Sequence, residues 1–205
     1  MFRIKICGIT SVADALGAVA AGADAIGLNF YGQSPRCCPI EHASKIAAAV
    51  PRHVCRVGVF VNASAGNIRA IVGSVGLDLV QLHGDEPPEA IAELGGLNVM
   101  KAFRVHDGLS DVVAYLDRCR SLAAVPRMVL FDAHHPSQYG GTGQPINGDI
   151  LLKSREQLGG LPLVLAGGMK PSNVAAAIAA ARPSAVDVAS GVETSPGVKS
   201  DSLVR

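Results

Sequence analysis

Short runs of Val, Ile, Leu and Phe alternate along this chain with Ala-rich stretches in which apolar residues recur at helical spacing. Such runs are typical of strands buried on both faces, and the stretches between them are typical of helices that cover a sheet. The pattern predicts strands at residues 2–7, 24–30, 56–61, 77–83, 98–104, 127–132, 162–167 and 185–190. It predicts helices at residues 12–22, 40–50, 64–75, 87–95, 109–124, 147–158 and 171–181.

Residues at the predicted helix ends support these boundaries. Ser11 and Ser64 precede the first and third helices, where a serine hydroxyl can cap free backbone N–H groups. Pro171 opens the seventh helix, and Gly22 stands where the first should end. No linker or low-complexity segment interrupts the pattern, so we expect one domain over residues 1–205.

Regular alternation of strand and helix predicts an α/β fold with a parallel sheet. Eight strands in one series favour a closed (β/α)8 barrel, the TIM-barrel fold. The alternative, an open doubly wound sheet, would favour a GxGxxG loop after the first strand, but the sequence there is CGIT. Only PGVKSDSLVR remains for an eighth helix, so we expect a shortened final helix of barely two turns.

Charge and composition narrow the possible partners. The 18 basic and 17 acidic residues are scattered and aromatic residues make up 4%, which argues against a nucleic acid as partner. No apolar run approaches the roughly 18 residues of a membrane helix, and the first residues do not resemble a secretory leader. The five cysteines, an odd number, are expected to be reduced thiols, so we expect a cytoplasmic protein that binds no membrane.

Two adjacent pairs of potential metal ligands do not predict a metal site. Cys37 and Cys38 lie too close together in sequence for the usual zinc spacing, and no CxxC occurs. Neighbouring side chains such as His134 and His135 usually diverge in a loop, so we expect no metal there.

The carboxyl ends of barrel strands meet at one face, which carries the active site. Cys7 and Asp132 end the first and sixth predicted strands and are our candidate base and acid. A free thiol is scarcely ionised at neutral pH, but Lys5 shares a strand face with Cys7, and we expect its ammonium to favour the thiolate. A lone carboxylate at the end of an apolar strand is costly and indicates a task for Asp132, with helix capping as the alternative.

Three glycine-rich loops follow the last three strands: YGGTG at 139–143, AGGMKPSN at 166–173 and ASGVE at 189–193. Glycine lets backbone N–H groups approach an anion closely, and the loops after strands seven and eight of such barrels commonly hold a phosphate. Tight turns without a ligand are the alternative for each loop, but three loops at neighbouring strand ends favour a phosphate site.

Three further polar residues at this face have two possible roles each. Arg36 either grips a carboxylate with its planar fork or is a solvated surface charge. Asp187 either hydrogen-bonds sugar hydroxyls or pairs with Lys5. For His83 we favour a satisfied strand-end histidine without a role in the chemistry.

Seven segments occur in a specific order over almost the whole chain: KICGIT, SPR, VGVFVN, QLHGDE, FDAHHPSQYGGTG, LAGGMKPSNV and VDVASGVETSPGVK. Together they resemble the phosphoribosylanthranilate isomerase family. Members of that family usually carry a full helix after PGVK, whereas here the segment is short.

The resemblance implies a cofactor-free Amadori rearrangement of N-(5-phosphoribosyl)anthranilate to 1-(2-carboxyphenylamino)-1-deoxyribulose 5-phosphate in tryptophan biosynthesis. Asp132 would be the general acid and Cys7 the general base, with Arg36 on the anthranilate carboxylate and Asp187 near the ribulose hydroxyls. The phosphate would lie among Gly141, Thr142, Gly143, Gly167, Gly168, Ser190 and Gly191. The expected partner is this small phosphosugar, and the expected assembly is a monomer or homodimer.

Two other functions stay open. One is another phosphosugar-handling barrel, such as a histidine-pathway isomerase or a dual-substrate enzyme; the latter should hold two phosphates across the barrel mouth, whereas one strong glycine cluster is present. The other is a non-catalytic phosphometabolite-binding protein, against which Cys7 and Asp132 argue.

Overall fold

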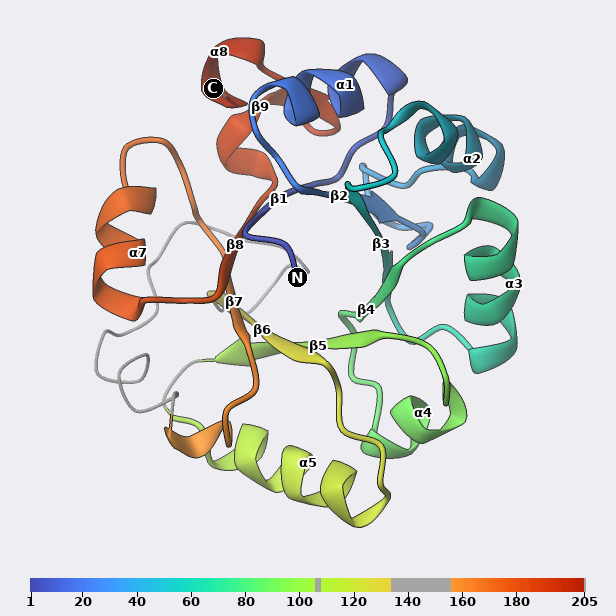
Figure 1. Cartoon of the computed structure of the whole chain (residues 1–205), viewed down its shortest axis with the longest axis vertical. Helices are drawn as coiled ribbons and strands as arrows, with labels where there is room; N and C mark the ends of the chain where they lie inside the picture. The colour runs from blue at the N-terminus through green and yellow to red at the C-terminus, as the bar shows by residue number, and fades with distance from the viewer. Residues whose placement is uncertain (106–107, 134–155, 205) are drawn as a thin grey trace.

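Eight parallel strands close into a barrel, and helices surround it (Figure 1). The structure, a computed structural model, describes residues 1–105, 108–133 and 156–204. The strands follow one another around the barrel as β1 Ile4–Cys7, β2 Ala25–Asn29, β3 Cys55–Phe60, β4 Leu79–Leu82, β5 Val99–Val105, β6 Met128–Ala133, β7 Leu163–Ala166 and β8 Ala185–Val188. The barrel prediction is confirmed, and an open sheet is excluded because β1 pairs with β8.

The helices on the outside match most of the predicted positions. They are α1 Val12–Ala20, α2 Ile40–Ala49, α3 Ala65–Val75, α4 Pro88–Glu93, α5 Ser110–Ser121, α7 Val174–Ala181 and α8 Asp201–Val204. Ser11 and Ser64 cap α1 and α3 as expected, each accepting a hydrogen bond from a backbone N–H of the first turn. Helix α7 starts later than predicted, after Asn173. Most of the helix predicted at 147–158 lies outside the described residues.

Inward-facing side chains alternate with outward-facing ones along each strand, as the two-residue period requires. A buried apolar cluster fills the inside of the barrel: Phe2, Ala25, Val57, Leu79, Met100, Ala102, Met128, Leu130, Val164, Ala166 and Ala185. Two residues further along β4, β6 and β8, the inward row continues as Gln81, Asp132 and Asp187. The interior therefore changes from apolar to polar toward the carboxyl ends of the strands.

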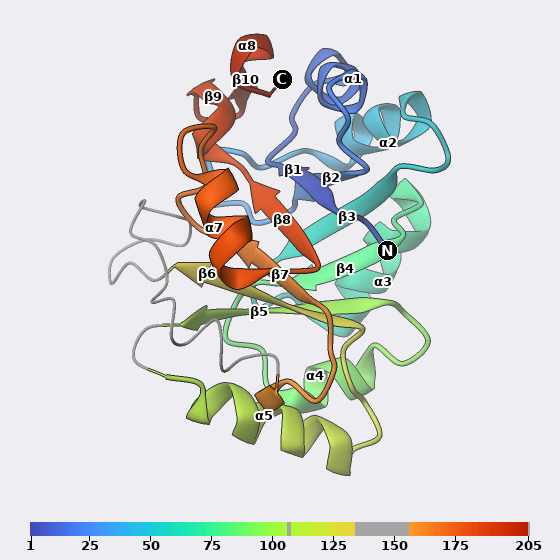
Figure 2. The same ribbon diagram turned by 60° about the vertical axis from the view of Figure 1, so that its left-hand side comes forward.

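The chain after β8 forms a small structure that the sequence analysis did not predict. A short 3-10 helix, η1 Ser190–Val192, leads into two antiparallel strands, β9 Glu193–Ser195 and β10 Val198–Lys199. Helix α8 then packs against α1 and η1, and Figures 1 and 2 both place it beside α1. Its four residues are about one turn, so the final helix is even shorter than expected.

None of the helices in the described part of the chain is long and apolar enough to cross a membrane.

Candidate active site

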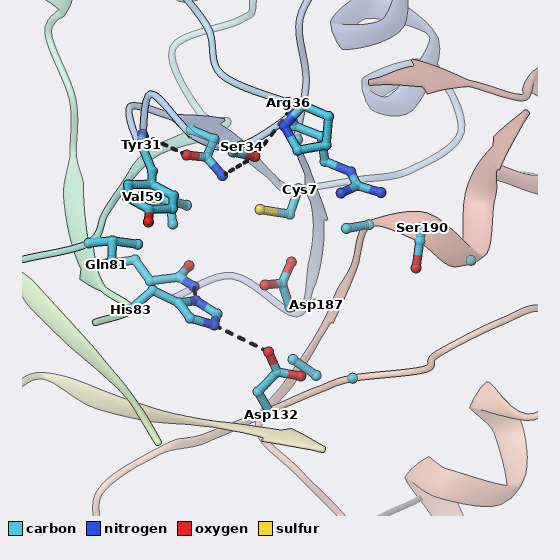
Figure 3. A pocket seen from close by; sticks show the side chains of 18 of the residues that line it. Cys7, Tyr31, Ser34, Arg36, Val59, Gln81, His83, Asp132, Asp187 and Ser190 are labelled. Atoms are coloured by element: carbon cyan, nitrogen blue, oxygen red, sulfur yellow. Dashed lines mark hydrogen bonds and ion pairs between the residues drawn. The ribbon is translucent and has the colours of Figure 1, made fainter. Parts of the chain in front are cut away.

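A cavity of about 510 Å³ opens at the carboxyl ends of the strands. Figure 3 shows the thiol of Cys7 and the carboxylate of Asp132 directed into it, with Asp187 between them in this view. The lining comes from strands and loops around the barrel: Cys7, Gly8, Asn29, Tyr31, Gln33, Ser34, Pro35, Arg36, Val59, Val61, Gln81, His83, Asp132, Ala166, Gly167, Gly168, Met169, Asp187, Ala189, Ser190 and Gly191. Thus the fold brings Cys7, Asp132 and two of the three predicted glycine loops around one space.

Cys7 ends β1, where its thiol is close to Lys5 and Gly27. A Cβ atom at Gly27 would lie 2.7 Å from the sulfur of Cys7 and 3.0 Å from Nζ of Lys5, so only glycine leaves room for both side chains. Burial raises the pKa of the Cys7 thiol, and this outweighs the lowering by the Lys5 ammonium. The Lys5 ammonium therefore favours the thiolate, as expected, although burial and the charge of Asp187 give the thiol a net rise in pKa.

Lys5 is fully buried inside the barrel and forms an ion pair with Asp187. Its Nζ donates to Oδ2 of Asp187 at 2.8 Å, and the two residues are register partners in the β1–β8 pairing. Burial lowers the pKa of Lys5, but the attraction of Asp187 leads to a net rise. Asp187 thus pairs with Lys5, and its Oδ1 has no hydrogen-bond partner in the described part of the chain. Oδ1 is therefore available for the other predicted role of Asp187, which is to accept a hydrogen bond from a sugar hydroxyl.

Asp132 ends a chain of three polar side chains from β6 and the end of β4. Nε2 of His83 lies 3.2 Å from Oδ2 of Asp132, and Nε2 of Gln81 lies 2.6 Å from Nδ1 of His83 (Figure 3). Oδ1 of Asp132 is buried without a partner among the described residues. His83 is a satisfied histidine, as expected, but it lies in the cavity wall and contacts the candidate acid.

Two of the predicted glycine loops meet at the cavity. Gly167 and Gly168 have φ of 85° and 63°, in the left-handed region that favours glycine. A Cβ atom at Gly191 would lie 1.7 Å from the carbonyl oxygen of Met169, so the loop after β8 packs directly on the loop after β7. Ser190 lines the same side of the cavity. The third predicted loop, with Gly141, Thr142 and Gly143, lies outside the described residues.

Arg36 is held by a carboxylate that the sequence analysis missed. Nε of Arg36 donates to both oxygens of Glu193 at 2.9 and 3.1 Å, and Nη2 donates to Oε2 at 2.7 Å. Nη1 makes no hydrogen bond within the described ranges, and Arg36 lines the cavity. Bonding to Glu193 raises the pKa of Arg36, which stays charged.

Lys199 completes this network from the other side of Glu193. Its Nζ donates to Oε1 of Glu193 at 2.7 Å, to the carbonyl oxygen of Ala189 at 3.3 Å and to the carbonyl oxygen of Cys7. Burial works against the carboxylate, but hydrogen bonds from Arg36 and Lys199 give a net lowering of the Glu193 pKa. We call Arg36, Glu193 and Lys199 the C-terminal clamp. Its sequence signal was the SGVETSPGVK segment, from which only the glycine loop was interpreted.

No group of three or more potential metal ligands occurs among the residues that the structure describes. The pair His134 and His135 lies outside them.

Comparisons with known proteins agree on one family. Residues 4–205 match the family described as N-(5'phosphoribosyl)anthranilate (PRA) isomerase. The chain is 46% identical over 205 residues, covering 100% of this chain and 96% of the relative, to an N-(5'-phosphoribosyl)anthranilate isomerase of Geobacter metallireducens. It is 39% identical to the crystal structure of phosphoribosyl anthranilate isomerase from Thermotoga maritima, with a TM-score of 0.87 over 100% of this chain and 95% of that one.

A further similar structure holds a bound ligand. It is a crystal structure of phosphoribosyl anthranilate isomerase in complex with reduced 1-(o-carboxyphenylamino)-1-deoxyribulose 5-phosphate. This chain is 38% identical to it, with a TM-score of 0.83, and the match covers 100% of this chain and 95% of the other.

Proposed function

Because this chain belongs to the N-(5'-phosphoribosyl)anthranilate isomerase family, we propose that its cavity performs the isomerisation with Cys7 as general base and Asp132 as general acid. The substrate is an aminoaldose, N-(5'-phosphoribosyl)anthranilate, and the product is the corresponding aminoketose. The reaction moves protons only, so it requires one group that gives a proton and one that takes a proton on the same sugar.

Asp132 starts the reaction by opening the furanose ring. Its carboxylic acid gives a proton to the ring oxygen while the bond between that oxygen and C1′ breaks. The lone pair of the anthranilate nitrogen forms the C1′=N double bond, which leaves a protonated Schiff base. Oδ1 is the oxygen suited to this transfer, because His83 engages Oδ2 and Oδ1 has no hydrogen-bond partner in the described part of the chain.

Cys7 then takes the proton from C2′ as a thiolate. The electrons of the C2′–H bond form a C1′=C2′ double bond and neutralise the nitrogen, giving an enolamine. This enolamine becomes the ketone when C1′ gains a proton and the hydroxyl on C2′ loses one. General acid–base groups of this kind typically contribute about 10²–10⁴-fold to the rate each.

The charges around the cavity fit a substrate with two anionic ends. The C-terminal clamp contains two cationic side chains and one carboxylate, so it carries one excess positive charge. We assign it the binding of the anthranilate carboxylate, which would accept hydrogen bonds from Nη1 of Arg36. The loops with Gly167, Gly168, Ser190 and Gly191 take the phosphate through backbone N–H groups. The ribose hydroxyls then lie near the free Oδ1 of Asp187.

The observation that carries this proposal is that Cys7 and Asp132, 125 positions apart in the chain, line one cavity together with two of the glycine loops. A non-catalytic phosphosugar-binding protein would not need a thiol and a carboxyl group facing the sugar.

The test measures the loss of anthranilate fluorescence when purified protein converts the substrate. We expect Cys7→Ala and Asp132→Asn each to lower kcat by about 10²-fold or more with an unchanged circular dichroism spectrum. Cys55→Ala, at the start of β3, and Asp117→Asn, exposed on α5, are the matched controls and should keep normal turnover. Near-normal turnover of either cavity variant would remove its assigned role.

A further inference from the structure

We propose that Gln81 is a positioning residue that sets the tautomer of His83 and thereby directs the acidic proton of Asp132 onto Oδ1, toward the substrate. This inference rests on the proposed role of Asp132 as the general acid. Gln81 is fully buried in the inward row of β4, and its side chain reaches His83, which in turn reaches Asp132 (Figure 3).

The first step concerns the two nitrogen atoms that face each other. The amide nitrogen of Gln81 has only hydrogen-bond donors, and it lies 2.6 Å from Nδ1 of His83. Nδ1 must therefore accept, which places the ring proton on Nε2. A hydrogen on Nδ1 would lie directly against the amide N–H group at this distance.

The second step follows the proton from His83 to Asp132. With its proton on Nε2, His83 donates to Oδ2 of Asp132 at 3.2 Å. An oxygen that accepts this bond is the poorer place for the proton of the carboxylic acid. The proton then sits on Oδ1, the oxygen without a partner in the described part of the chain, on a side chain that lines the cavity.

The opposite tautomer would place the proton where the substrate cannot use it. If Nδ1 carried the hydrogen, the lone pair on Nε2 would accept the acidic proton from Oδ2, and that proton would be held between two protein groups. The orientation of the Gln81 amide thus decides whether the acidic proton of Asp132 is available to the substrate. Gln81 acts through His83 and does not contact Asp132 itself.

The carbonyl oxygen of the Gln81 side chain explains how this orientation is maintained when substrate is bound. Its carbonyl oxygen Oε1 is buried and has no hydrogen-bond donor among the described residues, yet Gln81 lines the cavity. A hydroxyl group of the bound sugar can donate to this oxygen, whereas the reversed amide would present N–H groups there. Sugar binding therefore stabilises the orientation that keeps the proton on Oδ1.

The direct test is the ¹⁵N NMR spectrum of His83 in histidine-labelled full-length protein near pH 7, with His83→Gln used to assign its signals. We expect a neutral ring with the proton on Nε2, both free and with the reduced product 1-(o-carboxyphenylamino)-1-deoxyribulose 5-phosphate bound. A ring protonated on Nδ1, or on both nitrogens, would overturn the inference.

Gln81→Glu provides the kinetic test, because it keeps the shape of the side chain but presents an acceptor to Nδ1. We expect the His83 signals to move to the Nδ1–H form and kcat to fall by about 10-fold or more, a part of what a general acid contributes, with KM within about 2-fold. Wild-type kcat in this variant, with the tautomer reversed, would contradict the inference.

A neutral variant covers the case in which Gln81→Glu fails to fold. Gln81→Met removes the donor without adding a charge, so both tautomers should be seen and kcat should fall. A single Nε2–H tautomer with normal kcat in Gln81→Met would show that Gln81 has no such role. Asp132→Asn separates the two proposals. Normal turnover of Asp132→Asn would show that Asp132 is not the general acid. Loss of turnover in Asp132→Asn together with normal turnover in the Gln81 variants would exclude only the role of Gln81.

Discussion

Lys199→Met tests the C-terminal clamp, because it removes the ammonium that ties Glu193 to the main chain of β1 and the loop after β8. The side chain of Lys199 is 2% exposed, and its ammonium serves Glu193 and the carbonyl oxygens of Cys7 and Ala189. Methionine fills much of the same volume but offers no donor. The substitution therefore measures the effect of losing the hydrogen bonds while most of the side-chain packing is kept.

The expected loss of stability follows from these contacts. A hydrogen bond to a charged group contributes about 1.5–3 kcal/mol, and removal of one partner from a buried ion pair costs about 3–5 kcal/mol. Glu193 keeps its bonds to Arg36, so the lower end of this range applies, and we expect the free energy of unfolding to fall by about 3 kcal/mol. For a chain of 205 residues this lowers Tm by about 6–12 °C.

Urea and thermal unfolding followed by circular dichroism measure this change. Lys45→Met makes the same substitution at an exposed position of α2 and should alter stability by no more than about 0.5 kcal/mol. The double variant Lys199→Met/Glu193→Gln removes both charges of the pair, so its loss should be smaller than the sum of the two single losses by about 1 kcal/mol or more. Strict additivity, or a Lys199→Met protein within about 1 kcal/mol of wild type, would refute the reasoning.

Three further predictions concern the cavity. Asp187→Asn should speed the alkylation of Cys7 by iodoacetamide, because Asp187 and burial both raise the pKa of Cys7, against the effect of Lys5. In the wild type the alkylation rate should still rise with pH at pH 9.0. A plateau of the rate below that pH would contradict the raised pKa. Arg36→Met should raise KM by about 10-fold or more with a much smaller change in kcat, and an unchanged KM would exclude the carboxylate contact. Gly191→Ala should weaken inhibition by inorganic phosphate because its Cβ would lie 1.7 Å from the Met169 carbonyl, whereas Gly66→Ala, with open space around it, should not.

The sequence was enough to predict the barrel and the position of Cys7 and Asp132 at the carboxyl ends of its strands. Strand and helix differ in apolar period, so β1 to β8 could be located, and Cys7 and Asp132 stood out as polar ends of apolar strands. The late start of α7 was missed because Pro171 is a good opening residue in general, whereas here Asn173 bonds back to the Gly168 carbonyl and the helix begins after it.

Contacts between distant residues were the part that the sequence could not supply. Arg36 and Glu193 are 157 positions apart, and nothing in the local pattern of either residue reveals the pairing. The sign of the Cys7 pKa shift depends on how much protein surrounds the thiol, which is also not a local property. The partners of His83, which are Gln81 and Asp132, could not be identified from the sequence because they meet only once β4 and β6 face the same space.

Charged residues at and next to this cavity also help to close the barrel. The ion pair of Lys5 and Asp187 bridges β1 and β8, the seam where the first strand meets the last, and Lys199 ties the end of β1 to the loop after β8. Helix α8, the last helix of the barrel, is only one short turn. We therefore expect the polar contacts inside the barrel to contribute more to its closure than they would beneath a longer helix. A change at Lys5 or Lys199 therefore alters the position of the Cys7 thiol and the stability of the seam together. Kinetic effects of such changes have to be compared at matched fractions of folded protein before they are assigned to catalysis.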